Sequence, residues 1–142
     1  MVNALPFVQS QFWAIREGWI EAIEKIASRE AADFELVREM RADYREALAR
    51  FDGRLDGART TVIKGSTAAI PIHGPIFPKA NLFTEFSGGT SLEIAALDLD
   101  ACAGSDRVEN IILSIDSPGG VVDGVQEFAR MVRTQQKPIT AV

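Results

Sequence analysis

The run from Ile111 to Gly120 constrains the fold more than any other part of this sequence. It starts with a continuously apolar stretch, which is typical of a strand buried on both faces within a parallel sheet. It ends in Ser-Pro-Gly-Gly, and a helical pattern of apolar residues begins near Val122. A further apolar stretch, from Ile139 to Val142, follows that helix. These features predict a βαβ unit and therefore an α/β fold with a parallel sheet.

The residues before this unit predict two short strands and a second helix. Residues 60–63 and 67–72 have strand composition, and Pro71 favours an edge or a bulge in the second strand. Thr90 and Glu93 have the spacing of a capping box, which predicts the start of a helix. Two strands and a helix are thus expected before the βαβ unit.

Between these strands and that helix lies a stretch rich in proline and glycine, from Gly74 to Gly89. Such composition predicts a mobile loop over a cleft. Its aromatic residues, Phe77, Phe83 and Phe86, are expected to be exposed and to serve a partner or a substrate.

The first part of the sequence has a different character. From about Phe12 to Phe51 the apolar residues recur at helical spacing, and the pattern predicts two helices. The strand pattern begins only after Gly57. We therefore expect a helical N-terminal arm over residues 1–57 and an α/β unit over residues 58–142.

Composition limits the classes of function. The hydrophobic content of 46% and the net charge of -5 describe a globular protein and argue against binding to nucleic acid or to an anionic membrane. No apolar stretch has the length of a membrane span, so no membrane anchor is expected and the cytoplasm is the expected location. The single cysteine, Cys102, is expected to be a small buried residue. No metal-ligand spacing is present, and no cofactor is expected.

The loop from Asp116 to Gly120 is the candidate functional site. In an open parallel sheet, ligands gather at the carboxyl ends of the strands, which is where this loop is predicted to lie. Gly119 and Gly120 allow positive φ angles and a close approach of a substrate backbone, and the dipole of a following helix favours negative charge. The backbone N–H groups of these glycines are therefore candidates for holding an oxyanion. An ordinary strand-to-helix turn is the alternative.

Three blocks together point to a family. Residues 115–122 read Ile-Asp-Ser-Pro-Gly-Gly-Val-Val, residues 69–76 read Ala-Ile-Pro-Ile-His-Gly-Pro-Ile, and residues 137–142 read Lys-Pro-Ile-Thr-Ala-Val. The combination resembles serine peptidases of the signal peptide peptidase A type. It is most similar to the phage or prophage branch, whose members act as capsid or head-maturation proteases.

The resemblance implies a Clp protease/crotonase-like fold, present here only in part. It also implies a Ser-Lys dyad, an oxyanion amide from Gly119, and a peptide or protein substrate that lies along the turn as an added strand. The nucleophilic serine of the family follows the strand that matches residues 139–142, so it is expected after Val142. No catalytic residue is therefore expected within this chain. The resemblance further implies a homo-oligomer for the complete protein, in the host cytoplasm or the prohead.

The polar residues that resemble catalytic groups have structural interpretations. Lys137 only precedes the last strand, and Lys64 and Lys79 are candidates solely by analogy with longer bacterial forms. Ser117 is expected to cap the backbone of its own turn, and His73 to make a hydrogen bond at a strand end.

Three functions remain open from the sequence. The first is a serine endopeptidase represented by its N-terminal portion, which would be inactive alone. The second is a non-catalytic component of phage capsid assembly, such as a scaffold, whose arm mediates oligomerisation. The third is a crotonase-like acyl-CoA enzyme, which uses a similar oxyanion turn without a serine.

Overall fold

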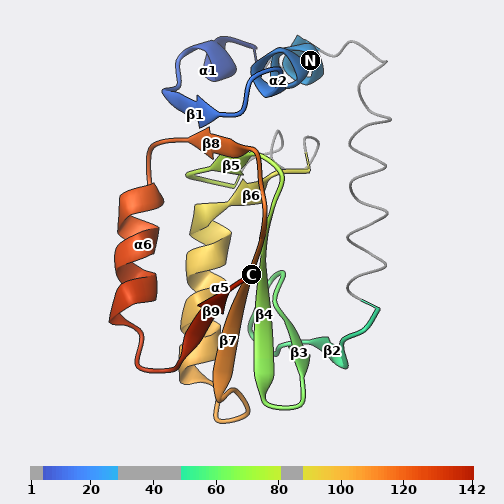
Figure 1. The fold of residues 1–142 in the computed structure, drawn as a ribbon, viewed down its shortest axis with the longest axis vertical. Helices are drawn as coiled ribbons and strands as arrows, with labels where there is room; N and C mark the ends of the chain where they lie inside the picture. The colour runs from blue at the N-terminus through green and yellow to red at the C-terminus, as the bar shows by residue number, and fades with distance from the viewer. Residues whose placement is uncertain (1–4, 29–48, 81–87) are drawn as a thin grey trace.

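The computed structural model describes residues 5–28, 49–80 and 88–142, which form two sheets and the helices around them (Figure 1). The first sheet contains, in spatial order, β1 (Trp13–Ile15), β8 (Gly119–Val121), β5 (Ile76–Phe77) and β6 (Thr90–Ser91). The second contains β2 (Gly53–Arg54), β3 (Val62–Lys64), β4 (Thr67–His73), β7 (Asn110–Asp116) and β9 (Ile139–Ala141). The described helices are α1 (Leu5–Gln9), α2 (Trp19–Ser28), α5 (Leu92–Gly104) and α6 (Val125–Thr134).

The centre of the larger sheet is parallel, as the apolar runs predict. β7 pairs with β4 along its whole length, from Thr67 opposite Asn110 to His73 opposite Asp116. β9 pairs with β7 on the other side, also in parallel. Because α6 connects β7 to β9, the predicted βαβ unit is confirmed, and the fold is α/β. Its assignment to the Clp/crotonase type stays a prediction.

Pro71 lies within β4, which is an inner strand of the sheet rather than an edge. The antiparallel pairing of β4 with β3 ends at Ala69, opposite Val62. At Pro71 one side of β4 therefore has no β3 partner, and a missing N–H on that side costs no ladder bond. The prediction that β4 is an edge strand was therefore wrong. At Pro71 itself, however, the strand has a neighbour on one side only.

Two clusters of buried residues hold the fold together. The larger one lies between α5 and the five-stranded sheet, and α6 adds half-buried residues to it. Its buried members are Leu55, Ile63, Ala68, Ile70, Ile72, Ala95, Leu99, Cys102, Val108, Ile111 and Leu113. The smaller cluster joins α1 and α2 to Phe77 and Val121 of the four-stranded sheet. The N-terminal elements therefore pack at the end of the molecule where β8 and β5 lie (Figure 1).

The helical description of the N-terminal arm is wrong at two places. Trp13–Ile15 is a strand, because its backbone pairs with β8, and this long-range pairing overrides the local helical spacing. Gly53–Arg54 is also a strand, paired with β3. The second predicted helix falls largely on residues 29–48, outside the described residues. α2 is the part of the predicted helical region that the structure confirms.

The stretch before α5 also differs from its prediction. Phe77 is fully buried in β5 instead of exposed on a loop, while Phe83 and Phe86 lie outside the described residues. The cap of α5 is Ser91, whose hydroxyl accepts the N–H of Ile94 at 3.3 Å. Thr90, the predicted capping residue, lies one position earlier. Its hydroxyl instead forms hydrogen bonds with the backbone of His73 at the end of β4.

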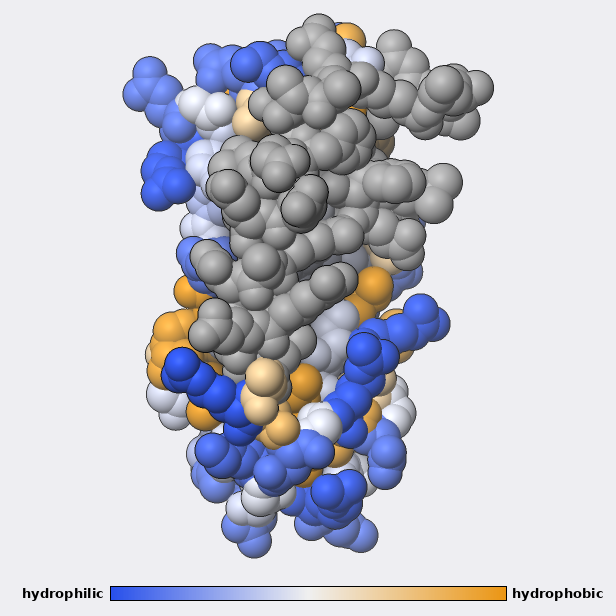
Figure 2. Space-filling view, turned by 90° about the vertical axis from the view of Figure 1, so that its right-hand side faces the viewer, coloured by the Kyte–Doolittle hydropathy of each residue, from blue (hydrophilic) through white to orange (hydrophobic). Residues whose placement is uncertain are grey.

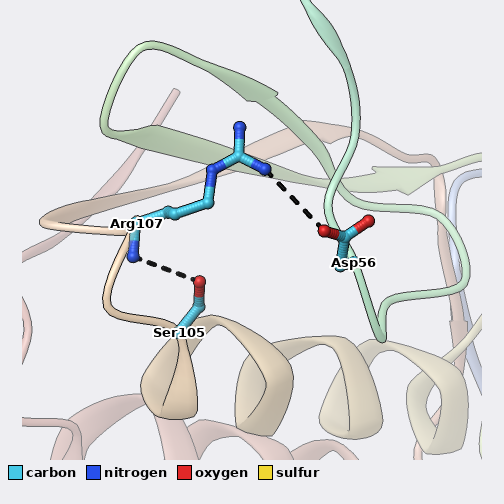
Figure 3. A network of polar contacts seen from close by, with 3 residues as sticks. All are labelled: Asp56, Ser105 and Arg107. Atoms are coloured by element: carbon cyan, nitrogen blue, oxygen red, sulfur yellow. Dashed lines mark hydrogen bonds and ion pairs between the residues drawn. The ribbon is translucent and has the colours of Figure 1, made fainter.

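The surface on the side of β2 and β3 carries mostly hydrophilic residues at its lower end, with hydrophobic residues between them (Figure 2). An ion pair joins two loops: Nη1 of Arg107 lies 3.8 Å from Oδ2 of Asp56 (Figure 3). The backbone N–H of Arg107 also donates a hydrogen bond to the hydroxyl of Ser105. Both charged side chains are largely exposed, so the pair adds little to stability. Within the described residues, no helix is long and apolar enough to cross a bilayer.

Candidate functional site

The Ser-Pro-Gly-Gly turn connects β7 to β8 at the carboxyl end of the parallel strands. The Ser117 hydroxyl donates a hydrogen bond to the carbonyl oxygen of Gly74 at 2.6 Å, and so ties the turn to the loop after β4. The same hydroxyl accepts the backbone N–H of Gly119 at 3.1 Å. Ser117 therefore caps its own turn, which confirms the structural interpretation of this residue.

Gly119 and Gly120 are required by the close approach of two neighbouring strands. Gly119 has a φ angle of 111°, and a Cβ atom there would overlap the carbonyl oxygen of Ala14 in β1. A Cβ atom at Gly120 would overlap the carbonyl oxygen of Ile76 in β5. Both glycines thus make room for backbone on either side of β8, rather than for an ordinary turn alone.

The helix expected directly after the turn lies further away from Gly119 than predicted. A helix does not follow the turn directly, because β8 intervenes and α6 begins only at Val125. The helix dipole is strongest within the first turn of a helix, so it cannot be assigned to Gly119 or Gly120 as the sequence pattern suggested. The Gly119 N–H must release the Ser117 hydroxyl before it can hold an oxyanion. The oxyanion role of these two glycines stays a prediction.

Both edges of β8 are occupied by strands of this chain. β1 pairs with it in antiparallel register, with Ile15 opposite Gly119, and β5 pairs with it in parallel through Ile76 and Gly120. Two further backbone hydrogen bonds extend the first pairing: Arg16 donates to Pro118 at 2.8 Å, and Val122 donates to Phe12 at 2.9 Å. A peptide that lies along the turn as an added strand therefore finds no open edge on β8.

His73 lies beside the turn, opposite Asp116 in the β4–β7 ladder. Burial lowers the pKa of His73, and the charge of Asp116 partly offsets this effect. Thr90 fixes the backbone of the same residue: its hydroxyl accepts the His73 N–H at 2.7 Å and donates to the His73 carbonyl oxygen at 2.8 Å. The Thr90 hydroxyl thus fixes the backbone of the last residue of β4, while the structural role of the His73 side chain stays a prediction.

The other titratable residues considered in the sequence either stabilise the fold or are exposed to solvent. The ammonium of Lys137 donates to the carbonyl oxygens of Cys102 at 2.8 Å and Ser105 at 2.7 Å, and so caps the C-terminus of α5. Cys102 is buried, and burial raises the pKa of its thiol to about 11. Lys64 and Lys79 are exposed. Lys137 and Cys102 thus have structural environments, one as a helix cap and one in the core.

A buried carboxylate on α5, that of Asp98, is not among the residues predicted from the sequence. Asp98 is inaccessible to solvent and accepts the backbone N–H groups of Arg59, Thr60 and Thr61, at 2.6, 2.8 and 2.8 Å. The hydroxyls of both threonines also donate to it. Desolvation alone would raise the pKa of Asp98, but these hydrogen bonds outweigh it and lower the pKa.

A signal for this contact is present in the sequence. Asp98 lies on the apolar stripe of its helix, three residues after Ala95 and four before Cys102. A charge at such a position requires buried partners. Within the described residues, no group of three or more histidine, cysteine or acidic side chains is placed to hold a metal ion.

Apolar side chains surround the turn on the surface. Phe12 is 79% exposed and Val122 51%, and the hydrogen bond between their backbones makes them neighbours. Ile115 and Val142 are exposed at the ends of β7 and β9, and are joined in the same way at 2.8 Å. Each pair thus forms a small exposed apolar patch, of the kind that another polypeptide can cover.

The chain is similar to a curated phage protein. The chain is 30% identical over 87 residues to the head-tail preconnector protein GP5 of Enterobacteria phage P21. The matched region makes up 60% of this chain but 17% of the relative. No family model matches the chain, and no solved structure matches it. The chain is thus similar to part of a phage protein, and it spans less than a fifth of that protein's length.

Proposed function

We propose that this chain acts in phage head assembly by binding other polypeptides of the head, and that it does not hydrolyse peptides by itself. The similarity to a head-tail preconnector protein carries this proposal. The exposed apolar side chains around the turn support it, because they provide anchors for a protein partner. The structural bonds of Ser117 and Lys137 support the second half, since both residues already have fixed partners.

Co-expression with head proteins tests this proposal. The chain is produced together with the major head protein and the portal protein encoded in the same genome, and assembled particles are separated by gradient sedimentation. We expect the chain to sediment with the particles. A chain that stays at the top of the gradient while particles form would contradict the proposal.

A pair of matched variants connects this result to the surface around the turn. Combined Phe12→Ser and Val122→Ser substitutions should lower the amount of chain in the particles at least fivefold, because they remove two exposed apolar anchors. Leu97→Ser is the control, since Leu97 is 53% exposed on α5 and its loss should leave incorporation unchanged. Equal incorporation of both variants would show that another surface binds the head.

A second candidate is a serine endopeptidase of the Ser-Lys type to which this chain contributes the oxyanion turn. One observation favours it: the Ser-Pro-Gly-Gly turn follows the carboxyl end of the parallel strand β7, where ligands of open α/β sheets gather. The Gly119 N–H would have to release the Ser117 hydroxyl to take part. On this proposal the nucleophile and the lysine lie outside these residues, so purified chain should leave unfolded protein substrates intact. Cleavage that is lost in a Ser117→Ala variant would place the nucleophile in this chain and contradict the proposal.

A further inference from the structure

Helix α6 presents a cationic face to solvent. Its apolar side chains Phe128, Met131 and Val132 are half-buried against the core, so the opposite side of the helix points outward. Arg130 and Arg133 are exposed and lie three residues apart, which makes them neighbours on the helix surface. Neither side chain forms an ion pair or a hydrogen bond within the described part of the chain. Both guanidinium groups can therefore bind a partner without breaking another contact there.

The two arginines line an open hollow of about 290 Å³, together with Gln126 and Thr134. All four side chains are polar, whereas sites for small organic ligands are mostly apolar. The Thr134 hydroxyl is engaged within the helix, since it donates to the carbonyl oxygens of Arg130 at 3.0 Å and Met131 at 3.2 Å. The donors left for a ligand are the guanidinium groups and the Gln126 amide. Because a guanidinium matches the two oxygens of a carboxylate, the hollow fits acidic side chains.

The charge of this hollow differs from that of the chain as a whole. α6 carries the two arginines and one acidic residue, Glu127, while the net charge of the chain is -5. Asp123 precedes the helix and lies about two turns from Arg130. Salt screens charges more than about 8 Å apart, so the local charge decides what a short ligand meets here. A nucleic acid would extend past α6 over the rest of an acidic chain. A short acidic segment of a protein is thus the favoured ligand.

Exposed apolar side chains lie at the N-terminal end of the same helix. Val125, its first residue, is 45% exposed, and its N–H donates to the carbonyl oxygen of Val122 at 3.4 Å. Val122 in turn has Phe12 as its neighbour. At 1.5 Å per residue, Val125 lies about 8 Å from Arg130 along the helix axis and about 12 Å from Arg133. One short segment can therefore contact the apolar end and the cationic hollow together.

We propose that α6 is the docking surface for an acidic segment of another head polypeptide. Its carboxylates bind Arg130 and Arg133, and an apolar side chain of the same segment rests on Phe12 and Val122. This inference rests on the proposed function and deepens it, because it names the chemistry of the partner that binds around the apolar side chains.

The probe for this surface is a short peptide with matched spacing. An extended segment advances about 3.3 Å per residue, so glutamates two and four residues after a leucine lie about 7 and 13 Å from it. The peptide Leu-Ala-Glu-Ala-Glu, blocked at both ends, has this arrangement, and Leu-Ala-Gln-Ala-Gln is its uncharged control. Each is added to ¹⁵N-labelled chain while backbone amide shifts are followed by NMR, which detects weak binding.

We expect saturable shift changes along α6 with the glutamate peptide, and changes at least fivefold smaller with the glutamine peptide at the same concentration. Combined Arg130→Ala and Arg133→Ala substitutions should reduce the changes to the same extent. Both side chains are exposed and alanine favours helix, so the fold is retained. Combined Arg50→Ala and Arg54→Ala substitutions are the matched control. They alter the net charge equally, at exposed positions beside β2 and away from α6 (Figure 1).

Three results would overturn the proposal. The first is equal shift changes with the two peptides, or none along α6. The second is the same changes with inorganic phosphate at equal concentration, which would show a site for any small anion. The third is a change of the α6 shifts when the chain alone is diluted, which would show that a second copy occupies the surface.

Head incorporation separates this inference from the proposed function. The Arg130→Ala and Arg133→Ala variant should enter particles at least fivefold less than the Arg50→Ala and Arg54→Ala control. Entry of both variants at the wild-type level would reject this inference alone. Binding of the glutamate peptide along α6, by a wild-type chain that stays out of particles, would reject the proposed function alone.

Discussion

Replacement of Asp98 by alanine is the sharpest test of the core of this fold. The substitution removes the acceptor for three backbone N–H groups and two hydroxyls. Arg59 and Thr60 are exposed, so water can replace the carboxylate for their donors. Thr61 is inaccessible to solvent, and its N–H and hydroxyl lose their partner without replacement.

The expected cost follows from those two donors. An unsatisfied buried donor costs about 1–3 kcal/mol, and the hydroxyl of Thr61 can turn toward another acceptor, so we expect a loss of about 2–4 kcal/mol in the free energy of unfolding. The entropy of unfolding for a chain of 142 residues is about 0.3 kcal/mol per kelvin, so Tm should fall by about 7–13 °C.

Urea unfolding followed by far-UV circular dichroism measures this change. Asp100→Ala is the control, because Asp100 is exposed on the same helix and makes the same change in helix propensity. The Asp98 contribution should also depend on pH. Since hydrogen bonding lowers the folded pKa of Asp98 below its ordinary value of 3.8, the stabilisation is present above pH 3.8 and is lost as the pH falls through the folded pKa. A loss below 0.5 kcal/mol near neutral pH would refute the reasoning.

Three further predictions follow from single contacts. Gly119→Ala should destabilise the fold by about 1–3 kcal/mol through its positive φ angle alone, and limited proteolysis should show earlier cleavage near β1, because the new Cβ displaces Ala14. Cys102 should react with a thiol reagent at pH 8 only after unfolding, because its thiol is buried and its pKa is raised to about 11; rapid labelling of native protein would contradict the structure. Lys137→Met should lower the free energy of unfolding by about 1 kcal/mol, because it removes the cap of α5. Thermal unfolding measures the change, and an unchanged Tm in the variant would show that water replaces the ammonium.

The sequence predicted the parts of the fold that depend on periodicity. The continuous apolar run of β7, the stripe of α5 and the strand β9 were each predicted, because burial on a face leaves a regular pattern in the sequence. The parallel pairing of β4, β7 and β9 also agrees with the prediction, since βαβ connections require it.

The elements that were missed depend on contacts between distant segments. β1 has helical spacing in its neighbourhood and is a strand only because β8 lies beside it. β8 itself is three residues long, too short for a periodic signal. Phe77 reads as a loop residue from its proline-rich neighbours, yet it is buried because α1 and α2 pack over it. Local pattern carries no information about such partners.

The candidate site shows the same division. The sequence predicts that Gly119 and Gly120 allow a close approach of substrate backbone, and in the structure it is backbone of the chain's own strands that approaches both glycines. The identity of the approaching backbone was not visible, since Ala14, which approaches Gly119, and Ile76, which approaches Gly120, both lie far earlier in the sequence. The engagement of the Gly119 N–H by Ser117 also required the structure.

Sedimentation of assembled heads tests the proposed function most directly. The chain is produced together with the major head protein and the portal protein of the same genome, and particles are separated from free protein on a gradient. We expect wild-type chain to sediment with the particles and the combined Phe12→Ser and Val122→Ser variant to do so at least fivefold less. Wild-type chain that stays at the top of the gradient while particles form would contradict the proposal.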